Sequence, residues 1–203
     1  MMFASLLAAV ALSIAPQDYD TRHFDVMEVE GSAGCAIEGN WAIEGRSPVY
    51  VQIQLMLDGE IYVGVSSYGW SRPSADTRKL IGVSFQQPNR DSQIFALGGV
   101  PSDDLRPGLV ALVSEDRREA FLTAFAGARS MNVYTFDMPE GDAPLDQSTR
   151  DLILEAGLQS SGQALTNARR CVANVKRRED ARRAREAQVD HIARDPFAPS
   201  NGD

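Results

Sequence analysis

Carboxylates are the side chains with the clearest capacity for catalysis in this sequence of 203 residues. Two carboxylates held close together can serve as the acid and the base, or as the acid and the nucleophile, of glycoside hydrolysis. Six of them lie among the central strands and turns of the chain: Asp58, Glu60, Asp76, Asp91, Asp103 and Asp104. Turn formation and surface solvation are the ordinary roles of such residues. A periplasmic hydrolase acting on a cell-wall or surface polymer is therefore the alternative function, behind a non-enzymatic one.

Other catalytic patterns are missing from the sequence. Nucleophilic triads need a histidine base, and the two histidines, His23 and His191, lie near the two ends of the chain. The sequence contains no Gly-x-Ser-x-Gly elbow, no phosphate-binding loop, no dinucleotide fingerprint and no His-Glu-x-x-His. A Cys-x-x-Cys pair is also absent. We therefore predict no catalytic residue, no cofactor and no metal site.

One loop has the composition of a recognition surface. Tyr68, Trp70 and Arg72 lie within five consecutive residues. Rigid aromatic rings and a guanidinium provide contact area at a low entropic cost. The competing interpretation is that Trp70 folds back and closes one end of the core. We predict that these three residues contact a binding partner.

A second candidate surface is a basic stretch near the C-terminus. From Arg169 to Arg185 eight Lys or Arg residues face two carboxylates, a net +6 in a chain whose formal net charge is -8. The arginines of its outer part are Arg177, Arg178, Arg182, Arg183 and Arg185. Such a segment can make weak contact with an anionic membrane surface or a surface polymer, can dock on its own acidic body, or can simply be a solvated helix. The acidic remainder argues against nucleic acid as a partner.

The first residues indicate export. An uncharged apolar run, Phe3 to Ala15, is shorter than the roughly 20 residues that span a bilayer. Its length and small-residue end predict a signal peptide at 1–15, cleaved after Ala11 or Ala15, and a periplasmic or secreted protein. A buried N-terminal helix of a cytosolic protein and an uncleaved membrane anchor are the alternatives.

The two cysteines, Cys35 and Cys171, lie 136 positions apart. An even number of cysteines in an exported chain indicates a disulfide, and two cysteines allow only one intramolecular pairing. Two buried free thiols are the alternative. We predict a Cys35–Cys171 disulfide.

Period-2 alternation predicts a β-rich body over residues 24–160. The expected strands are 24–29, 35–38, 41–44, 49–57, 60–67, 79–86, 93–100, 108–113, 132–138 and 150–155. Gly39-Asn40 predicts a two-residue hairpin turn, and Asp58-Gly59 predicts another. The last segment, 150–155, can also open a helix.

Helical spacing predicts a short packed helix at 115–128 and a long C-terminal helix at 161–193. Ser160 and Gln163 form a capping-box pattern before the long helix. Its apolar stripe fades after Val175, so we expect packing to about that residue and then a charged extension. Residues 16–23 and 194–203 are expected to be a loose N-terminus and a disordered tail. The predicted fold is α+β: a mostly antiparallel, sandwich-like body with one short and one long helix.

The order of these elements resembles the invasion-associated locus B group of small exported bacterial proteins. The similar features are the Asp58-Gly59 hairpin, Gly157-Leu158 leading into Ala164-Leu165, and Cys171 on a terminal helix. The resemblance covers residues 35–175 and implies a β-sandwich with a non-catalytic role in the envelope. The charged extension beyond Val175 departs from the pattern of the group. We therefore predict an exported binding or interaction module, with an envelope protein or a surface polymer as its partner.

Overall fold

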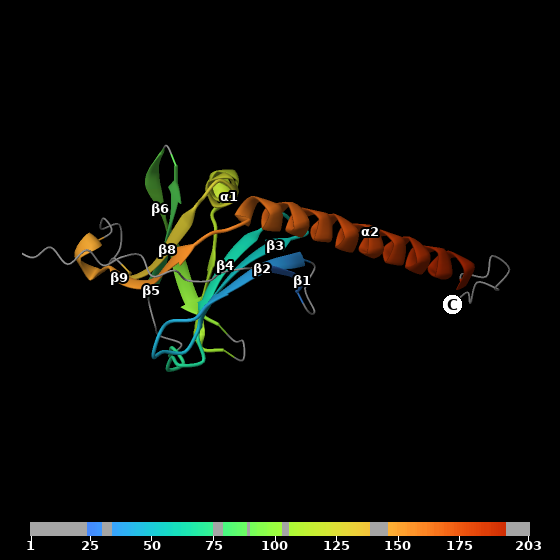
Figure 1. Cartoon of the computed structure of the whole chain (residues 1–203). Coiled ribbons are helices and arrows are strands. Elements are labelled where there is room, and N and C mark those ends of the chain that lie inside the picture. Colours follow the sequence, from blue (N-terminus) through green and yellow to red (C-terminus); the bar gives the residue numbers. More distant parts are fainter. Residues whose placement is uncertain are drawn as a thin grey trace, which may run out of the picture.

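The structure, a computed structural model, describes residues 24–29, 34–74, 79–88, 90–102, 106–138 and 146–193. Side chains are not described for residues 90–93, 147 and 188–193. The predicted signal peptide at 1–15, the loose segment at 16–23 and the tail at 194–203 lie outside the described residues. The fold is α+β, with a curled antiparallel sheet, one short helix and one long C-terminal helix, as the sequence predicts (Figure 1).

The described residues form a nine-stranded antiparallel sheet with the order β1-β2-β3-β4-β7-β6-β5-β8-β9. The predicted sandwich-like body is thus one continuous sheet that curls, rather than two separate sheets. The strands are β1 (Asp25–Glu28), β2 (Gly34–Trp41), β3 (Val49–Met56), β4 (Ile61–Ser66), β5 (Lys79–Gln87), β6 (Arg90–Pro101), β7 (Gly108–Leu112), β8 (Ser130–Asp137) and β9 (Asp151–Gly157).

The turn between β3 and β4 confirms the Asp58-Gly59 prediction. Gly59 has φ +86°, a conformation that a residue without a Cβ adopts at little cost. The backbone N–H of Met56 donates to the Glu60 carbonyl at 2.9 Å, and the Glu60 N–H donates to the Asp58 carboxylate at 3.0 Å. This turn sets the register in which Val51 pairs with Val65 on the inner face.

The predicted hairpin at Gly39-Asn40 is wrong. β2 runs straight through both residues, with Gly39 opposite Val51 and Asn40 opposite Tyr50. A Cβ on Gly39 would overlap the Trp41 ring and lie 3.0 Å from the Phe24 ring, so this glycine makes room for the two aromatic side chains. The chain turns later, at Gly45, where φ is +70°. Pairing along the whole of β3 outweighed the local turn preference.

The predicted helix at 115–128 is present as η1 (Glu115–Arg117) followed by α1 (Arg118–Ala126). Phe121, Leu122 and Phe125 of α1 are buried. The Phe121 ring lies 5.2 Å from both Phe85 and Phe95, in edge-on and nearly edge-on geometry that aromatic pairs favour. This aromatic cluster fills the α1 end of the curled sheet.

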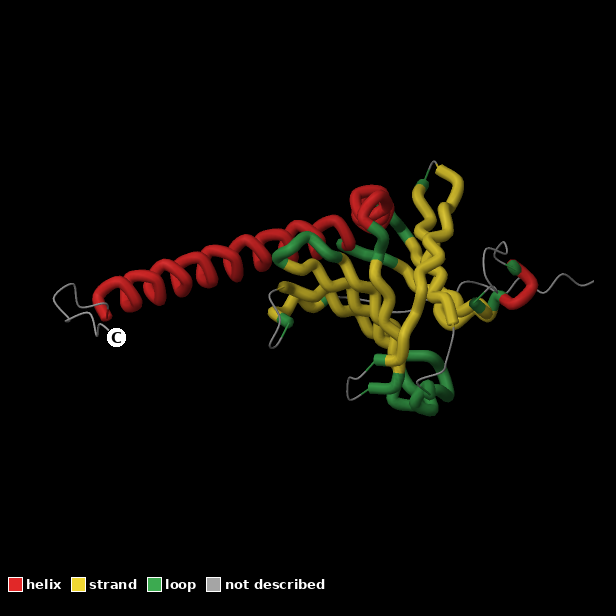
Figure 2. Tube along the Cα trace, turned by 180° about the vertical axis from the view of Figure 1, so that it is seen from behind, coloured by secondary structure: helices red, strands yellow, loops and turns green. Residues whose placement is uncertain are grey.

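A short 3-10 turn, η2 (Gln147–Thr149), precedes β9. The long helix α2 (Ser161–Ala193) follows β9. Val175 is the last buried residue that the structure describes on α2, and the side chains from 176 to 187 are exposed or half-buried. The Gln163 side chain donates to Asn167 rather than completing the predicted capping box. Both views show the outer half of α2 extending away from the sheet (Figures 1 and 2).

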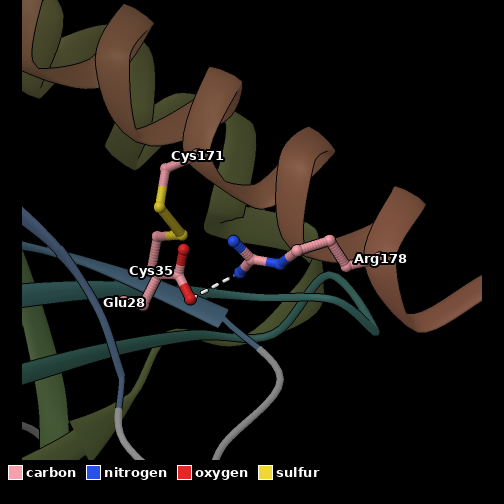
Figure 3. The surroundings of a disulfide bond; sticks show 4 residues. All are labelled: Glu28, Cys35, Cys171 and Arg178. Carbon is pink, nitrogen blue, oxygen red and sulfur yellow. Dashed lines mark hydrogen bonds and ion pairs between the residues drawn. A yellow bond between two sulfur atoms is a disulfide. The ribbon is translucent and has the colours of Figure 1, made fainter. Parts of the chain in front are cut away.

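A disulfide joins Cys35 of β2 to Cys171 of α2, with the two Cα atoms 6.1 Å apart. The prediction is confirmed. Cys35 is completely buried, and Figure 3 shows the bond crossing from the helix to the sheet. About two turns further along α2, Arg178 pairs with Glu28 of β1 at 2.5 Å. The first half of α2 is thereby attached to the β1–β2 edge.

Candidate functional site

A cleft of about 620 Å³ lies at the end of the sheet opposite α1, and we call it the apolar cleft. Its volume lies within the roughly 300–1,000 Å³ that small-molecule sites occupy. Its lining residues come from the loop before β3, from the loop after β4, and from strands β3, β4, β5, β7, β8 and β9. They are Ile43, Arg46, Ser47, Val49, Val65, Ser67, Gly69, Trp70, Ser71, Pro73, Lys79, Ile81, Gly108, Leu109, Thr135, Leu152 and Ile153.

The curl of the sheet creates this cleft. Val49 of β3 and Leu152 of β9 both line it, although β3 and β9 are six positions apart in the strand order. In a flat sheet these strands would be separated by roughly 29 Å, at about 4.8 Å per strand. The sheet must therefore fold round so that both of its halves face the same space. The helices cover the other end, and this end stays open.

Trp70 is held over the cleft by a compact turn. The N–H of Ser67 donates to the Pro107 carbonyl at 3.0 Å, and the N–H of Trp70 donates to the Ser67 carbonyl at 3.3 Å. The buried hydroxyl of Ser67 also accepts from the Gly69 N–H at 3.3 Å. Trp70 is half-buried, packs against the core and lines the cleft. Its ring therefore closes part of the core and also offers a surface to a ligand.

Tyr68 does not share this site. It is 63% exposed, and its ring meets Tyr50 edge-on with 5.9 Å between centroids. Tyr50 alternates along β3 with the buried Val49 and Val51, so it points to the outer face of the sheet. The predicted contact residues are thus divided between two faces. Arg72 is exposed and lies between Ser71 and Pro73, which both line the cleft.

An ion pair supports the outer face beside Tyr50. Arg106 stacks on the Tyr50 ring, 4.1 Å from its centroid, and donates two hydrogen bonds to Glu38, at 3.2 and 2.5 Å. Hydrogen bonding to Glu38 raises the pKa of Arg106, against the opposing effect of burial. Both groups are mostly covered, and a two-pronged pair of this kind fixes geometry well. We assign Glu38 and Arg106 a structural role in holding the loop that contains Arg106 against β2 and β3.

The rim of the cleft is cationic and hydroxylated. Arg46 and Lys79 line it, and among the described lining residues there is no aspartate or glutamate. Lys79 pairs with Asp137 at 2.5 Å on the exposed surface. Arg46 is exposed and makes no ion pair within the described part of the chain. The hydroxyls of Ser47, Ser67, Ser71 and Thr135 also belong to the described lining.

The carboxylates considered for hydrolysis are not gathered in this cleft as far as the structure describes them. Asp58 and Glu60 belong to the β3–β4 turn, where the Glu60 carboxylate accepts from the Tyr62 hydroxyl at 2.5 Å. This hydrogen bond is the main cause of the raised pKa of Tyr62. Asp76, Asp103 and Asp104, like His23 and the side chains of Asp91 and His191, lie outside the described residues. No cluster of three or more metal-ligating side chains occurs among the residues searched.

Several of the basic residues of α2 are engaged with neighbours. Arg182 contacts Glu179 at 2.8 Å and Glu186 at 2.7 Å, and Arg177 donates to Asn174. Hydrogen bonding to Glu28 raises the pKa of Arg178. Hydrogen bonding to Glu179 is the main cause of the raised pKa of Arg182. Arg183 and Arg185 are exposed. Within the described residues, no helix combines the length and the apolarity that crossing a membrane requires.

Sequence reasoning identified Trp70 but missed most of the cleft. Ile43 falls in the predicted strand 41–44, Arg46 lies outside every predicted element, and Leu152 falls in the segment 150–155, predicted as a strand or the start of a helix. Of these residues, Leu152 has the one feature that points to a ligand. It is a large apolar residue on the edge strand β9, and its side chain is 55% exposed. No protein-family model, curated protein or solved structure matches the chain. The resemblance to the invasion-associated locus B group therefore stays a prediction.

Proposed function

We propose that this protein is a non-enzymatic binding protein of the cell envelope, and that the apolar cleft holds the apolar part of its ligand. The observation that carries the proposal is an open cleft of about 620 Å³ lined by Val49, Val65, Ile81, Leu109 and Trp70. Covering such apolar surface with a ligand is favourable by about 25 cal/mol per Å² removed from water.

The envelope location rests on two features. The apolar run from Phe3 to Ala15 has the length of a signal peptide. The Cys35–Cys171 disulfide is compatible with an extracytoplasmic protein, because disulfides persist in oxidising compartments. A binding role also fits the composition of the cleft lining, in which hydroxyls and two cations are the polar groups among the described residues.

The binding role is tested with N-phenyl-1-naphthylamine, a neutral apolar dye that fluoresces on leaving water. We expect saturable binding of one dye per chain. Leu152→Glu places a carboxylate on the wall of the cleft and should weaken dye binding about tenfold or more, since covering a carboxylate with an apolar dye removes its hydration. Leu152 is 55% exposed, so the fold should tolerate the change.

Val100→Glu is the matched control, because Val100 is also an exposed strand residue, at 59%, and does not line the cleft. It should bind the dye as the unmodified protein does. Trp70→Ala, whose thermal unfolding must be followed in parallel, should also weaken dye binding. Absence of saturable binding, or an equal loss in Val100→Glu, would contradict the proposal.

A further inference from the structure

Within the described lining of the cleft, the charge is opposite in sign to the net charge of the chain. The chain has a formal net charge of -8, yet the described lining contains Arg46 and Lys79 and no carboxylate. A cationic rim above apolar walls matches a ligand that has an apolar chain and an anionic head.

Arg46 is the better placed of the two cations. It follows Gly45, whose φ of +70° makes the turn, and its N–H donates to the Ile43 carbonyl at 2.9 Å. The turn holds the residue at the cleft while its side chain is exposed. Because no carboxylate of the described residues pairs with Arg46, its guanidinium can give both prongs to an incoming carboxylate.

Lys79 contributes in second place. Its ammonium is 2.5 Å from the Asp137 carboxylate, and both side chains are exposed to solvent, so the pair is worth little. Asp137 is not among the lining residues, whereas Lys79 is. A ligand carboxylate at the rim can therefore share or replace this partner. The hydroxyls of Ser47, Ser71 and Thr135 add hydrogen-bond donors beside the two cations.

The apolar walls determine how such a ligand lies. Val65, Ile81 and Leu109 are buried core residues that also line the cleft, and Trp70 and Ile153 pack against the same core. An anionic head that entered this region would lose its hydrating water and gain no hydrogen bond or opposite charge in return, which is costly. The chain therefore enters the cleft and the head stays at the rim.

From this arrangement we propose that the ligand is a single-chain amphiphile with a carboxylate head, whose chain lies against Trp70 and whose carboxylate is bound by Arg46, with Lys79 beside it. This inference rests on the proposed function and names the class of ligand. It assigns the head-group preference to the rim and the chain affinity to the walls, so that the two contributions can be measured separately.

The experiment compares three amphiphiles of equal chain length by calorimetric titration: decanoate, decanol and decyltrimethylammonium. The two ions are kept below their micellar concentrations and decanol below its solubility limit. We expect decanoate to bind about fivefold more tightly than decanol, the effect of one or two exposed ion pairs, and the cation to bind most weakly. The advantage of decanoate should shrink in 0.5 M salt, at which exposed charges are screened within a few ångströms.

Arg46→Gln should remove most of the decanoate advantage and leave decanol binding unchanged, and Lys79→Gln should do so in part. Arg129→Gln is the control. Arg129 is exposed and immediately precedes β8. Thr135, near the other end of β8, lines the cleft. Arg129→Gln therefore removes one positive charge at the end of β8 away from the cleft.

The outcomes separate the two proposals. Equal affinities for decanoate and decanol overturn the head-group inference while the binding function stands. Equal losses in Arg46→Gln and Arg129→Gln also overturn it, because they show an effect of net charge alone. If none of the three amphiphiles binds, both the inference and the proposed function are wrong.

Discussion

Gly108 shows how little room a single residue has where β7 pairs with β4. It begins β7, pairs with Ser66 and lines the apolar cleft. An added Cβ would lie 2.6 Å from the Ser66 Cβ and 2.8 Å from the Ser66 Cα, and it would also contact the Val65 carbonyl oxygen. Since these are backbone or backbone-attached atoms, no flexible side chain can move away to relieve the contact.

Gly108→Ala should therefore lower the free energy of unfolding by about 2–3 kcal/mol, as overpacking of a well-filled site does. Gly98→Ala is the control, because a Cβ at Gly98 meets nothing within 4 Å. That change should be neutral or slightly stabilising, since alanine restricts the unfolded chain. Urea denaturation of both variants checks the prediction, and equal stabilities would contradict it.

At the scale of elements, α2 consists of two parts held by different forces. The part up to Val175 packs on β1, β2 and α1 through buried apolar residues and is tied by the disulfide. Beyond Val175 the exposed Arg178–Glu28 pair joins the helix to β1. Otherwise this part depends mainly on its own side-chain pairs, above all Glu179 and Glu186 with Arg182. Such pairs stabilise a helix by only a few tenths of a kcal/mol each.

The outer part of α2 should therefore be sensitive to acid. The hydrogen bond from Arg182 lowers the pKa of Glu179. The resulting stabilisation is present above the pKa of an unfolded glutamate, about 4.3, and is lost as the pH falls through the lower folded value. We expect the Cα chemical shifts of residues 176–187 to move toward coil values as the pH drops from 5 to 3.

Residues 161–172 should keep helical shifts over the same range, because packing and the disulfide hold them. Glu179→Gln should be less helical in its outer part at neutral pH and should change less on acidification. Shifts of residues 176–187 that do not move with pH, or that move as much in Glu179→Gln, would contradict this account of the outer helix.

The whole molecule has an open end and a tethered end. The apolar cleft occupies the open end, and the aromatic cluster lies at the other. Figure 2 shows α1 and the first part of α2 at that other end. The disulfide joins residues 136 positions apart, so the chain segment that it closes into a loop contains the strands from β3 to β9. A cross-link over so long a loop stabilises mainly by restricting the unfolded chain, by about 4–5 kcal/mol on the chain-entropy model.

The double variant Cys35→Ala, Cys171→Ala should accordingly lose up to about 4–5 kcal/mol of unfolding free energy in urea titrations. In the natively expressed protein, thiol alkylation followed by intact mass should detect no free thiol before reduction and two after it. The mass should correspond to a chain that begins at Leu12 or Pro16. A full-length mass with two free thiols would contradict the export prediction and the envelope part of the proposed function.

Local patterns predicted the elements well and the site poorly. The alternation along 49–57 and 60–67 predicted β3 and β4, because one buried face imposes a period of two. Gly39-Asn40 misled, because its turn preference is weaker than eight paired residues of β2 against β3. Trp70 was identified from composition. Its companions Arg46 and Leu152 were not, because they reach the cleft from loops and strands far apart in the chain.

By itself, the sequence determined most of the strands, the Asp58-Gly59 turn, the two helices and the cysteine pairing, all of which depend on neighbouring residues or on a choice among few partners. Only the tertiary structure decided that β3 and β9 face one cleft, that Tyr68 and Trp70 lie on different faces, and that the outer half of α2 extends from the body. These features arise from the summed twist of many strands and from contacts distant in sequence, which no local pattern records.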